Sequence, residues 1–126
     1  RACFYDDLYI FGSDGSFVNE LGDETWLEAW QGVDTDQCGS PVAPHDGLVD
    51  STWALNEDNS IITITGNGAY LGIPKALNNG ELGADNPGTF SGSIDYMVEL
   101  NDANNRMVLN IESGSNVWWR FVLEKQ

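Results

Sequence analysis

Apolar and polar residues alternate along much of this chain, which is the period of a β-strand with one buried face. The alternation is clearest in three segments near the C-terminus, residues 94–100, 107–111 and 117–124. Segments rich in asparagine, serine and glycine, residues 101–105 and 113–116, separate these three. The pattern predicts consecutive antiparallel strands joined by short turns.

The same period occurs earlier in the chain, at residues 8–11, 17–18, 24–30, 53–55 and 61–65. The last of these contains only isoleucine and threonine, which favour strands because their side chains branch at Cβ. Helix signals are nearly absent. We therefore expect an all-β protein, an antiparallel meander of roughly seven to nine strands closed into a barrel, with a β-sandwich as the alternative.

Two long segments interrupt the alternation, residues 31–50 and 74–92, and both are rich in glycine and proline. Loops of this length in a small domain often carry function or cover part of the molecule. Residues 70–81, which include Tyr70 and Lys75, are a candidate rim for a binding site.

The length of 126 residues predicts a single domain over residues 1–126 with one core. Twenty acidic residues against five basic ones give a formal net charge of −15. This charge repels nucleic acid and anionic lipid, so we expect neither a nucleic-acid nor a membrane partner. Neutral or cationic partners remain.

Cys3 and Cys38 are the two cysteines of the chain, and their spacing matches neither a zinc site nor a redox motif. We interpret them as one structural disulfide, in preference to two free buried thiols. A disulfide of this kind indicates an oxidising, extracellular compartment.

The five tryptophans are the most informative aromatic residues, and two of them, Trp118 and Trp119, are adjacent. On a strand they must point to opposite faces. We place Trp119 in the core, on one face with Val117, Phe121 and Leu123, and Trp118 outward beside Arg120. The alternative is that all five tryptophans fill the core.

An exposed aromatic face can stack on the apolar face of a sugar, while nearby polar side chains bind its hydroxyls. Trp26 and Trp30 would share one face if residues 24–30 form a strand. The candidate ligand-binding residues are Trp118, Arg120, Trp26, Trp30, Trp53, Tyr70 and Lys75.

Catalytic signals are weak. Glu24 and Glu28 are four residues apart, but Trp26 lies midway and strand positions i and i+4 are too distant for a retaining glycosidase pair. We interpret both as a solvated acidic face. His45 and Asp46 lack a nucleophile elbow, so we expect His45 to be structural, packed between Pro44 and the sheet. The sequence therefore predicts a protein that is not an enzyme.

No cofactor or metal is expected. The acidic segments 34–36 and 102–105 could offer oxygen ligands to calcium, but neither has EF-hand spacing, and plain turns explain both better.

Four blocks, residues 24–32, 41–47, 68–76 and 117–121, resemble a module found in secreted proteins of marine bacteria. That module often lies beside family 16 glycoside hydrolase domains and is similar to lipocalin-like β-barrels. The resemblance implies a lipocalin-like barrel, glycan binding, and a larger multidomain glycoside hydrolase as the parent protein. Such modules carry a further tryptophan-containing segment upstream of the position of Arg1, so an upstream first strand would be missing or supplied by another molecule.

From these observations we expect a non-catalytic carbohydrate-binding module of an extracellular protein that binds neutral polysaccharide by tryptophan stacking. The alternative is a structural subunit of an extracellular assembly joined by strand complementation. An open strand edge would allow self-association of that kind.

Overall fold

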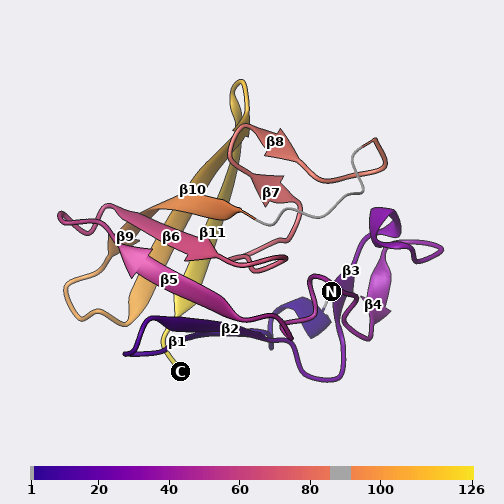
Figure 1. Ribbon diagram of the computed structural model, residues 1–126, viewed down its shortest axis with the longest axis horizontal. Helices are drawn as coiled ribbons and strands as arrows, with labels where there is room; N and C mark the ends of the chain where they lie inside the picture. Colours follow the sequence, from indigo (N-terminus) through magenta and orange to yellow (C-terminus); the bar gives the residue numbers. More distant parts are fainter. Residues whose placement is uncertain (1, 86–91) are drawn as a thin grey trace.

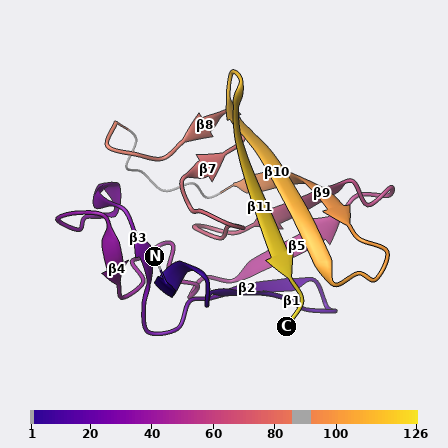
Figure 2. The same ribbon diagram turned by 180° about the vertical axis from the view of Figure 1, so that it is seen from behind.

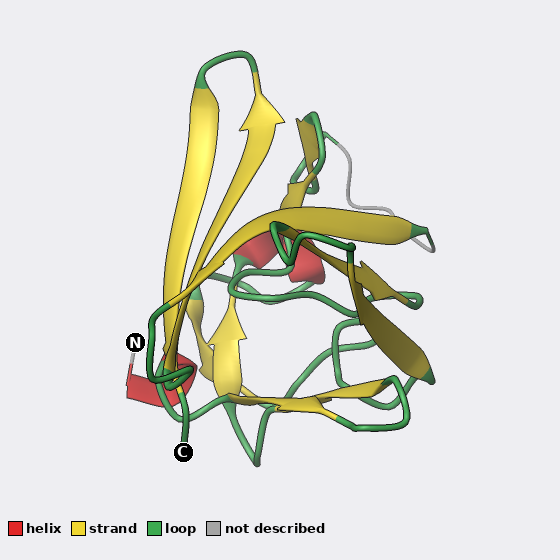
Figure 3. Ribbon diagram, turned by 90° about the vertical axis from the view of Figure 1, so that its left-hand side faces the viewer, coloured by secondary structure: helices red, strands yellow, loops and turns green. Residues whose placement is uncertain are grey.

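The computed structural model describes residues 2–85 and 92–126 (Figure 1). Seven strands form one antiparallel sheet that curls into a half-barrel (Figure 3). Their order follows the chain, with two insertions: β1 (Leu8–Phe11), β2 (Ser16–Glu20), β5 (Ser51–Leu55), β6 (Ile61–Thr65), β9 (Ser93–Leu100), β10 (Arg106–Gly114) and β11 (Val117–Glu124). The prediction of an all-β antiparallel meander is confirmed.

The insertions form two small hairpins. β3 (Thr25–Leu27) pairs with β4 (Gln37–Gly39), and β7 (Ala76–Leu77) pairs with β8 (Gly80–Glu81). β4, β7 and β8 lie inside the two segments that the sequence predicts as long loops. Two 3₁₀ turns, η1 (Ala2–Phe4) and η2 (Ala29–Gln31), complete the described elements.

The predicted strand over residues 24–30 is wrong in its second half. β3 ends at Leu27, and the chain then turns at η2. The backbone N–H of Gln31 donates to the carbonyl of Glu28 at 2.9 Å, and the Gln31 side chain accepts from the Glu28 N–H at 3.1 Å. Trp26 and Trp30 therefore do not share a strand face.

Alternation along the long strands builds the core. In β9, Ile94, Tyr96 and Val98 are buried while their neighbours are exposed. Leu109 and Ile111 of β10 are at most 1% exposed, and Ile62 and Ile64 of β6 are equally buried. These side chains lie on the concave side of the sheet and form one cluster.

The chain segment 69–76 fills the concave side of the sheet. Its apolar residues Ala69, Tyr70, Leu71, Ile73 and Ala76 are between 0% and 8% exposed. Buried backbone groups need partners, and side chains of the sheet supply them here. The Asn19 side chain donates to the Tyr70 carbonyl at 2.8 Å, and the Tyr96 hydroxyl accepts from the Leu71 N–H at 3.0 Å.

Gly72 is the point at which this segment packs against the last strand. Its φ is +81°, and a Cβ there would lie 2.4 Å from the ring of Phe121 in β11. On the other side, the Tyr9 hydroxyl of β1 donates to the Gly72 carbonyl and accepts from its N–H, both at 3.2 Å. Side chains of β1 and β11 thus meet on one glycine between them.

β1 and β11 are the two edge strands of the main sheet, so the sheet stays open between them within the described residues. Figure 2 shows β11 running toward β1 at its C-terminal end.

The β7–β8 hairpin packs where β10 separates from β9. Direct pairing of β9 with β10 ends at Met97 and Asn110. Beyond that point the Asn78 side chain donates to the Asp95 carbonyl at 2.8 Å and accepts from its N–H at 2.9 Å. The Asn79 N–H donates to the Glu112 carbonyl at 3.0 Å. The hairpin therefore replaces strand pairing at this split.

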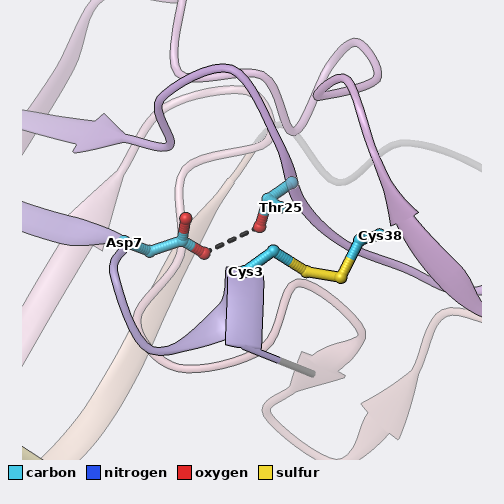
Figure 4. The surroundings of a disulfide bond; sticks show 4 residues. All are labelled: Cys3, Asp7, Thr25 and Cys38. Atoms are coloured by element: carbon cyan, nitrogen blue, oxygen red, sulfur yellow. Dashed lines mark hydrogen bonds between the residues drawn. A yellow bond between two sulfur atoms is a disulfide. The ribbon is translucent and has the colours of Figure 1, made fainter.

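A disulfide joins Cys3 and Cys38, so the predicted pairing is confirmed (Figure 4). It connects η1 to β4 and holds the N-terminal segment against the β3–β4 hairpin. Asp7 supports the same junction, because its Oδ2 accepts a hydrogen bond from the Thr25 hydroxyl at 2.7 Å. No helix in residues 2–85 or 92–126 is long and apolar enough to cross a membrane.

Candidate functional site

The last strand presents two different faces. Trp119, Phe121 and Leu123 are half-buried and pack against the core, whereas Trp118 is 52% exposed on the outer, convex face beside Arg120. The predicted opposite environments of the two adjacent tryptophans are confirmed. Val117, which the sequence places with Trp119, is instead 46% exposed. The reason is a register shift between Glu112 and Gly114, which frees this end of β11 from the regular pleat.

The strand register shows which side chains surround Trp118. Glu112 of β10 lies directly opposite Trp118, and Asn110 lies opposite Arg120. We call Trp118, Arg120, Asn110 and Glu112 the outer platform. In the described part of the chain, none of these four side chains makes a hydrogen bond or ion pair with the protein.

The hydrogen bonding of the indole N–H groups distinguishes Trp118 from the other tryptophans. Trp30 donates to Glu28 at 2.8 Å, Trp53 to the Gly12 carbonyl at 2.8 Å, and Trp119 to Glu81 at 2.7 Å. Trp26 is half-buried on β3 and also interacts within the protein. Among the described residues, Trp118 has no such partner, so its ring and its N–H are both available to a ligand.

A second group of residues, which includes the predicted site residues Trp30 and Lys75, meets on the inner side of the sheet, the opposite face of β11 from Trp118. The Lys75 ammonium lies 3.0 Å from Glu28 Oε1 and 5.1 Å from the centre of the Trp119 ring. Glu81 accepts from both Trp119 and Ser113. We call Glu28, Trp30, Lys75, Glu81 and Trp119 the barrel-end cluster.

The charged and polar groups of the barrel-end cluster bond to one another. Glu28 uses one carboxylate oxygen for Lys75 and the other for the indole of Trp30. The interpretation of Glu28 as a solvated acid is therefore wrong; its side chain is 15% exposed. The cluster ties the end of β3 to segment 69–76 and to β11, and its contacts are those of a structural junction.

Tyr70 and Trp53 belong to neither the outer platform nor the barrel-end cluster. Tyr70 is 3% exposed in the core, held by Asn19 through its backbone, so its ring offers no surface to a ligand. Trp53 packs edge-on against Phe11, with ring centres 5.5 Å apart. Neither residue joins the outer platform, and neither rims a surface site.

His45 is buried and makes several contacts within the protein. It is 5% exposed, its Nδ1 lies 3.1 Å from the Gly68 carbonyl, and its ring packs edge-on against Trp30 and Tyr70. Burial lowers the pKa of His45, which favours the neutral ring. Ser51, a nearby hydroxyl in sequence, donates to the Phe17 carbonyl at 2.7 Å. These contacts do not assemble a nucleophile and base.

Asp7 has the most perturbed carboxyl group in the described residues. Burial, with a smaller contribution from Asp6, raises its pKa to about 6, against the opposing hydrogen bond from Thr25. Its Oδ1 is buried without a hydrogen-bond partner. Burial also raises the pKa of Tyr9, Tyr70 and Tyr96, so all three hydroxyls remain protonated at neutral pH.

No family model, curated protein or solved structure matches this chain. The geometry of the site is therefore the basis for a proposal of function. In the described part of the chain, no three acidic, histidine or cysteine side chains are grouped as metal ligands would be.

Two of the four outer-platform residues, Asn110 and Glu112, were not predicted from the sequence. Asn110 and Glu112 are ordinary polar residues of an alternating strand, and only the register of β10 with β11 places them beside Arg120 and Trp118. The available signal was the short turn at residues 113–116, which predicts that the residues flanking it pair across a hairpin.

Proposed function

We propose that this protein is a non-catalytic carbohydrate-binding module that takes neutral polysaccharide on the outer platform. The observation that supports it best is Trp118, a half-exposed indole on the outer face of β11 without a hydrogen-bond partner among the described residues. A sugar ring would stack on the indole, and Arg120, Asn110 and Glu112 would bind its hydroxyls.

The charge of the molecule supports a neutral ligand. The formal net charge of −15 opposes the approach of sulfated or uronic acid polymers at long range. Stacking and hydrogen bonds to hydroxyls act at short range, so salt will alter the affinity little. A shallow platform buries little of the ligand, and we expect a binding free energy of about −4 to −8 kcal/mol, in the millimolar to micromolar range.

The disulfide supports a place outside the cell, where cysteine pairs persist. We propose a secreted protein, and a larger glycoside hydrolase as the parent chain that would use such a module to hold its substrate.

Affinity electrophoresis against laminarin, xylan, agarose and alginate, at low and high salt, tests the proposal. We expect at least one neutral polymer to retard the protein and the Trp118→Ala variant to run freely. Tyr5→Ala is the matched control, because Tyr5 is an aromatic residue that is 80% exposed and lies outside the strands of the main sheet. Retardation by alginate alone, or by none of the polymers, would overturn the proposal.

The open edges of the sheet favour a second candidate, a structural subunit of an extracellular assembly joined by strand complementation. β1 and β11 both have a free edge, and each carries exposed apolar side chains on its outer face: Leu8 and Ile10 on β1, and Val122 on β11. A donated strand would hydrogen-bond to the unpaired backbone groups of an edge strand and cover these side chains. Light scattering distinguishes the two candidates: a constant monomer mass at rising concentration removes this one.

A further inference from the structure

Polar side chains on the outer face of the sheet fall into two groups. Between β6 and β9 they bond to each other: Thr63 donates to Asp95 at 2.6 Å, and the Thr65 and Ser93 hydroxyls lie 2.7 Å apart. Toward β10 and β11 the polar side chains of the outer platform have no such partners within the described residues. The outer platform therefore offers donors and acceptors that no described residue uses, unlike these two pairs between β6 and β9.

An apolar strip continues from the outer platform across the strands. Met97 of β9 lies directly opposite Asn110, and Ile61 of β6 lies directly opposite Met97. Met97 is 55% exposed and Ile61 is 37% exposed. Neighbouring strands are about 4.8 Å apart, so the line from β11 to β6 extends roughly 14 Å.

We propose that an extended, unbranched neutral glycan crosses the strands on this line, from Trp118 over Asn110 to Met97. This inference rests on the proposed function; it gives the ligand a direction across the strands and adds Met97 as a contact residue. Trp118 stacks on one sugar ring, the Asn110 amide binds hydroxyls of the next, and the Met97 side chain packs under the apolar face of a third. Asn110 is diagonal to Trp118 across the hairpin, a distance of about 7–8 Å that long side chains and one sugar ring can bridge.

The local charge agrees with a neutral occupant. Arg120 and Glu112 are the charged members of the outer platform, and their signs are opposite. A second copy of the chain would bring another net charge of −15 to this face, which is unfavourable. The strip therefore suits a glycan better than a dimer contact.

The test uses β-1,4-linked xylo-oligosaccharides from disaccharide to hexasaccharide, with laminari-oligosaccharides of equal length for comparison, in calorimetric titrations. Affinity for the xylo series should rise with length. Asn110→Ala should weaken binding of all but the shortest member about tenfold, the effect of about 1.4 kcal/mol for one lost polar contact. Met97→Ala should weaken only the longer members. Glu99→Gln, on the outer face of the same strand but off this line, is the matched control.

The outcomes separate the inference from the function on which it rests. If Trp118→Ala abolishes binding while Asn110→Ala and Met97→Ala bind like the wild type, the path is wrong and carbohydrate binding by stacking on Trp118 stands. If the laminari series shows the stronger length dependence, the ligand is not an extended chain. If no oligosaccharide binds, both proposals fall. A dimer that Met97→Asp dissociates would identify the strip as a protein contact and overturn the inference.

Discussion

Trp118 and Trp119 are neighbours in the chain and differ in what they contribute to the fold. Trp119 lies parallel to Phe121, with ring centres 6.2 Å apart, under the Lys75 ammonium and bonded to Glu81. Trp118 makes no comparable contact in the described part of the molecule. The strand period alone separates the two roles.

Replacing each tryptophan should therefore have unequal effects on stability. Trp119→Ala should lower the free energy of unfolding by about 2–4 kcal/mol, somewhat less than a fully buried tryptophan would. Trp118→Ala should cost less than about 1 kcal/mol, as surface changes do. Urea unfolding followed by circular dichroism measures both values. Equal losses would show that Trp118 is also part of the core and would remove the outer platform.

Asp7 makes stability depend on pH. Its pKa is about 6 in the folded protein and 3.8 in the reference state, so the folded protein holds the proton more tightly. Stability therefore falls as the pH rises from about 4 through about 6, and the cost persists at higher pH.

The Asp7→Asn variant should remove this cost, because an amide can still accept from Thr25 and carries no charge. We expect its melting temperature to exceed that of the wild type by an amount that grows between pH 4 and about 6.5 and is then constant. Asp23→Asn, an exposed acid, controls for the change in net charge. A difference that does not vary with pH would contradict the raised pKa of Asp7.

At the scale of elements, the segment 69–76 and the edge strands depend on one another. Phe121 can lie against the backbone of this segment because Gly72 has no side chain, and Tyr9 binds the same glycine from β1. Contacts from Tyr9 and Phe121 to Gly72 therefore connect the two edge strands of the open sheet through the segment on its concave side.

Gly72→Ala tests this junction. Its φ of +81° and the Phe121 ring 2.4 Å from the new Cβ should together cost at least about 3 kcal/mol. Gly22→Ala is the matched control, since φ there is +62° with no atom within 4 Å, and strain alone should cost about 1 kcal/mol. Urea unfolding compares the two variants.

A double-mutant cycle with Phe121→Leu shows whether the Gly72 effect comes from the ring. The two changes should be strongly non-additive, with Gly72→Ala costing less when the ring is absent. Additive losses, or equal costs at Gly72 and Gly22, would mean that Phe121 does not pack on this glycine.

At the scale of the whole molecule, the disulfide connects the N-terminal segment to the β3–β4 hairpin across a sequence separation of 35 residues. Reduction should lower the free energy of unfolding by about 3–4 kcal/mol in the chain-entropy model. Urea unfolding with and without reductant measures this, and the Cys3→Ser/Cys38→Ser variant should be insensitive to reductant. Alkylation of both thiols in the untreated protein, seen by mass spectrometry, would contradict the bond and remove the support that it gives to the proposed extracellular location.

The long strands and their inward faces followed from the sequence alone. Alternation is a local property, and it placed Tyr96, Leu109 and Trp119 on the core side without any knowledge of neighbours. The same argument failed at residues 24–30. There the Gln31 side chain and the Glu28 carbonyl stabilise a turn that periodicity cannot detect. The two cysteines predicted their own bond because no other partner exists in the chain.

Only the tertiary structure decided which distant residues meet. Segment 69–76 reads as a glycine-containing loop, yet it fills the concave side of the sheet, because Asn19, Tyr9 and Tyr96 satisfy its backbone from strands far away in sequence. Trp30 and Lys75, which the sequence grouped with Trp118 as candidate ligand-binding residues, lie instead in the barrel-end cluster with Glu28. Strand register placed Glu112 opposite Trp118, Asn110 opposite Arg120, and Met97 opposite Asn110. Periodicity sets the face on which a side chain lies, but register and curl set its neighbours, and these depend on contacts between residues far apart in the chain.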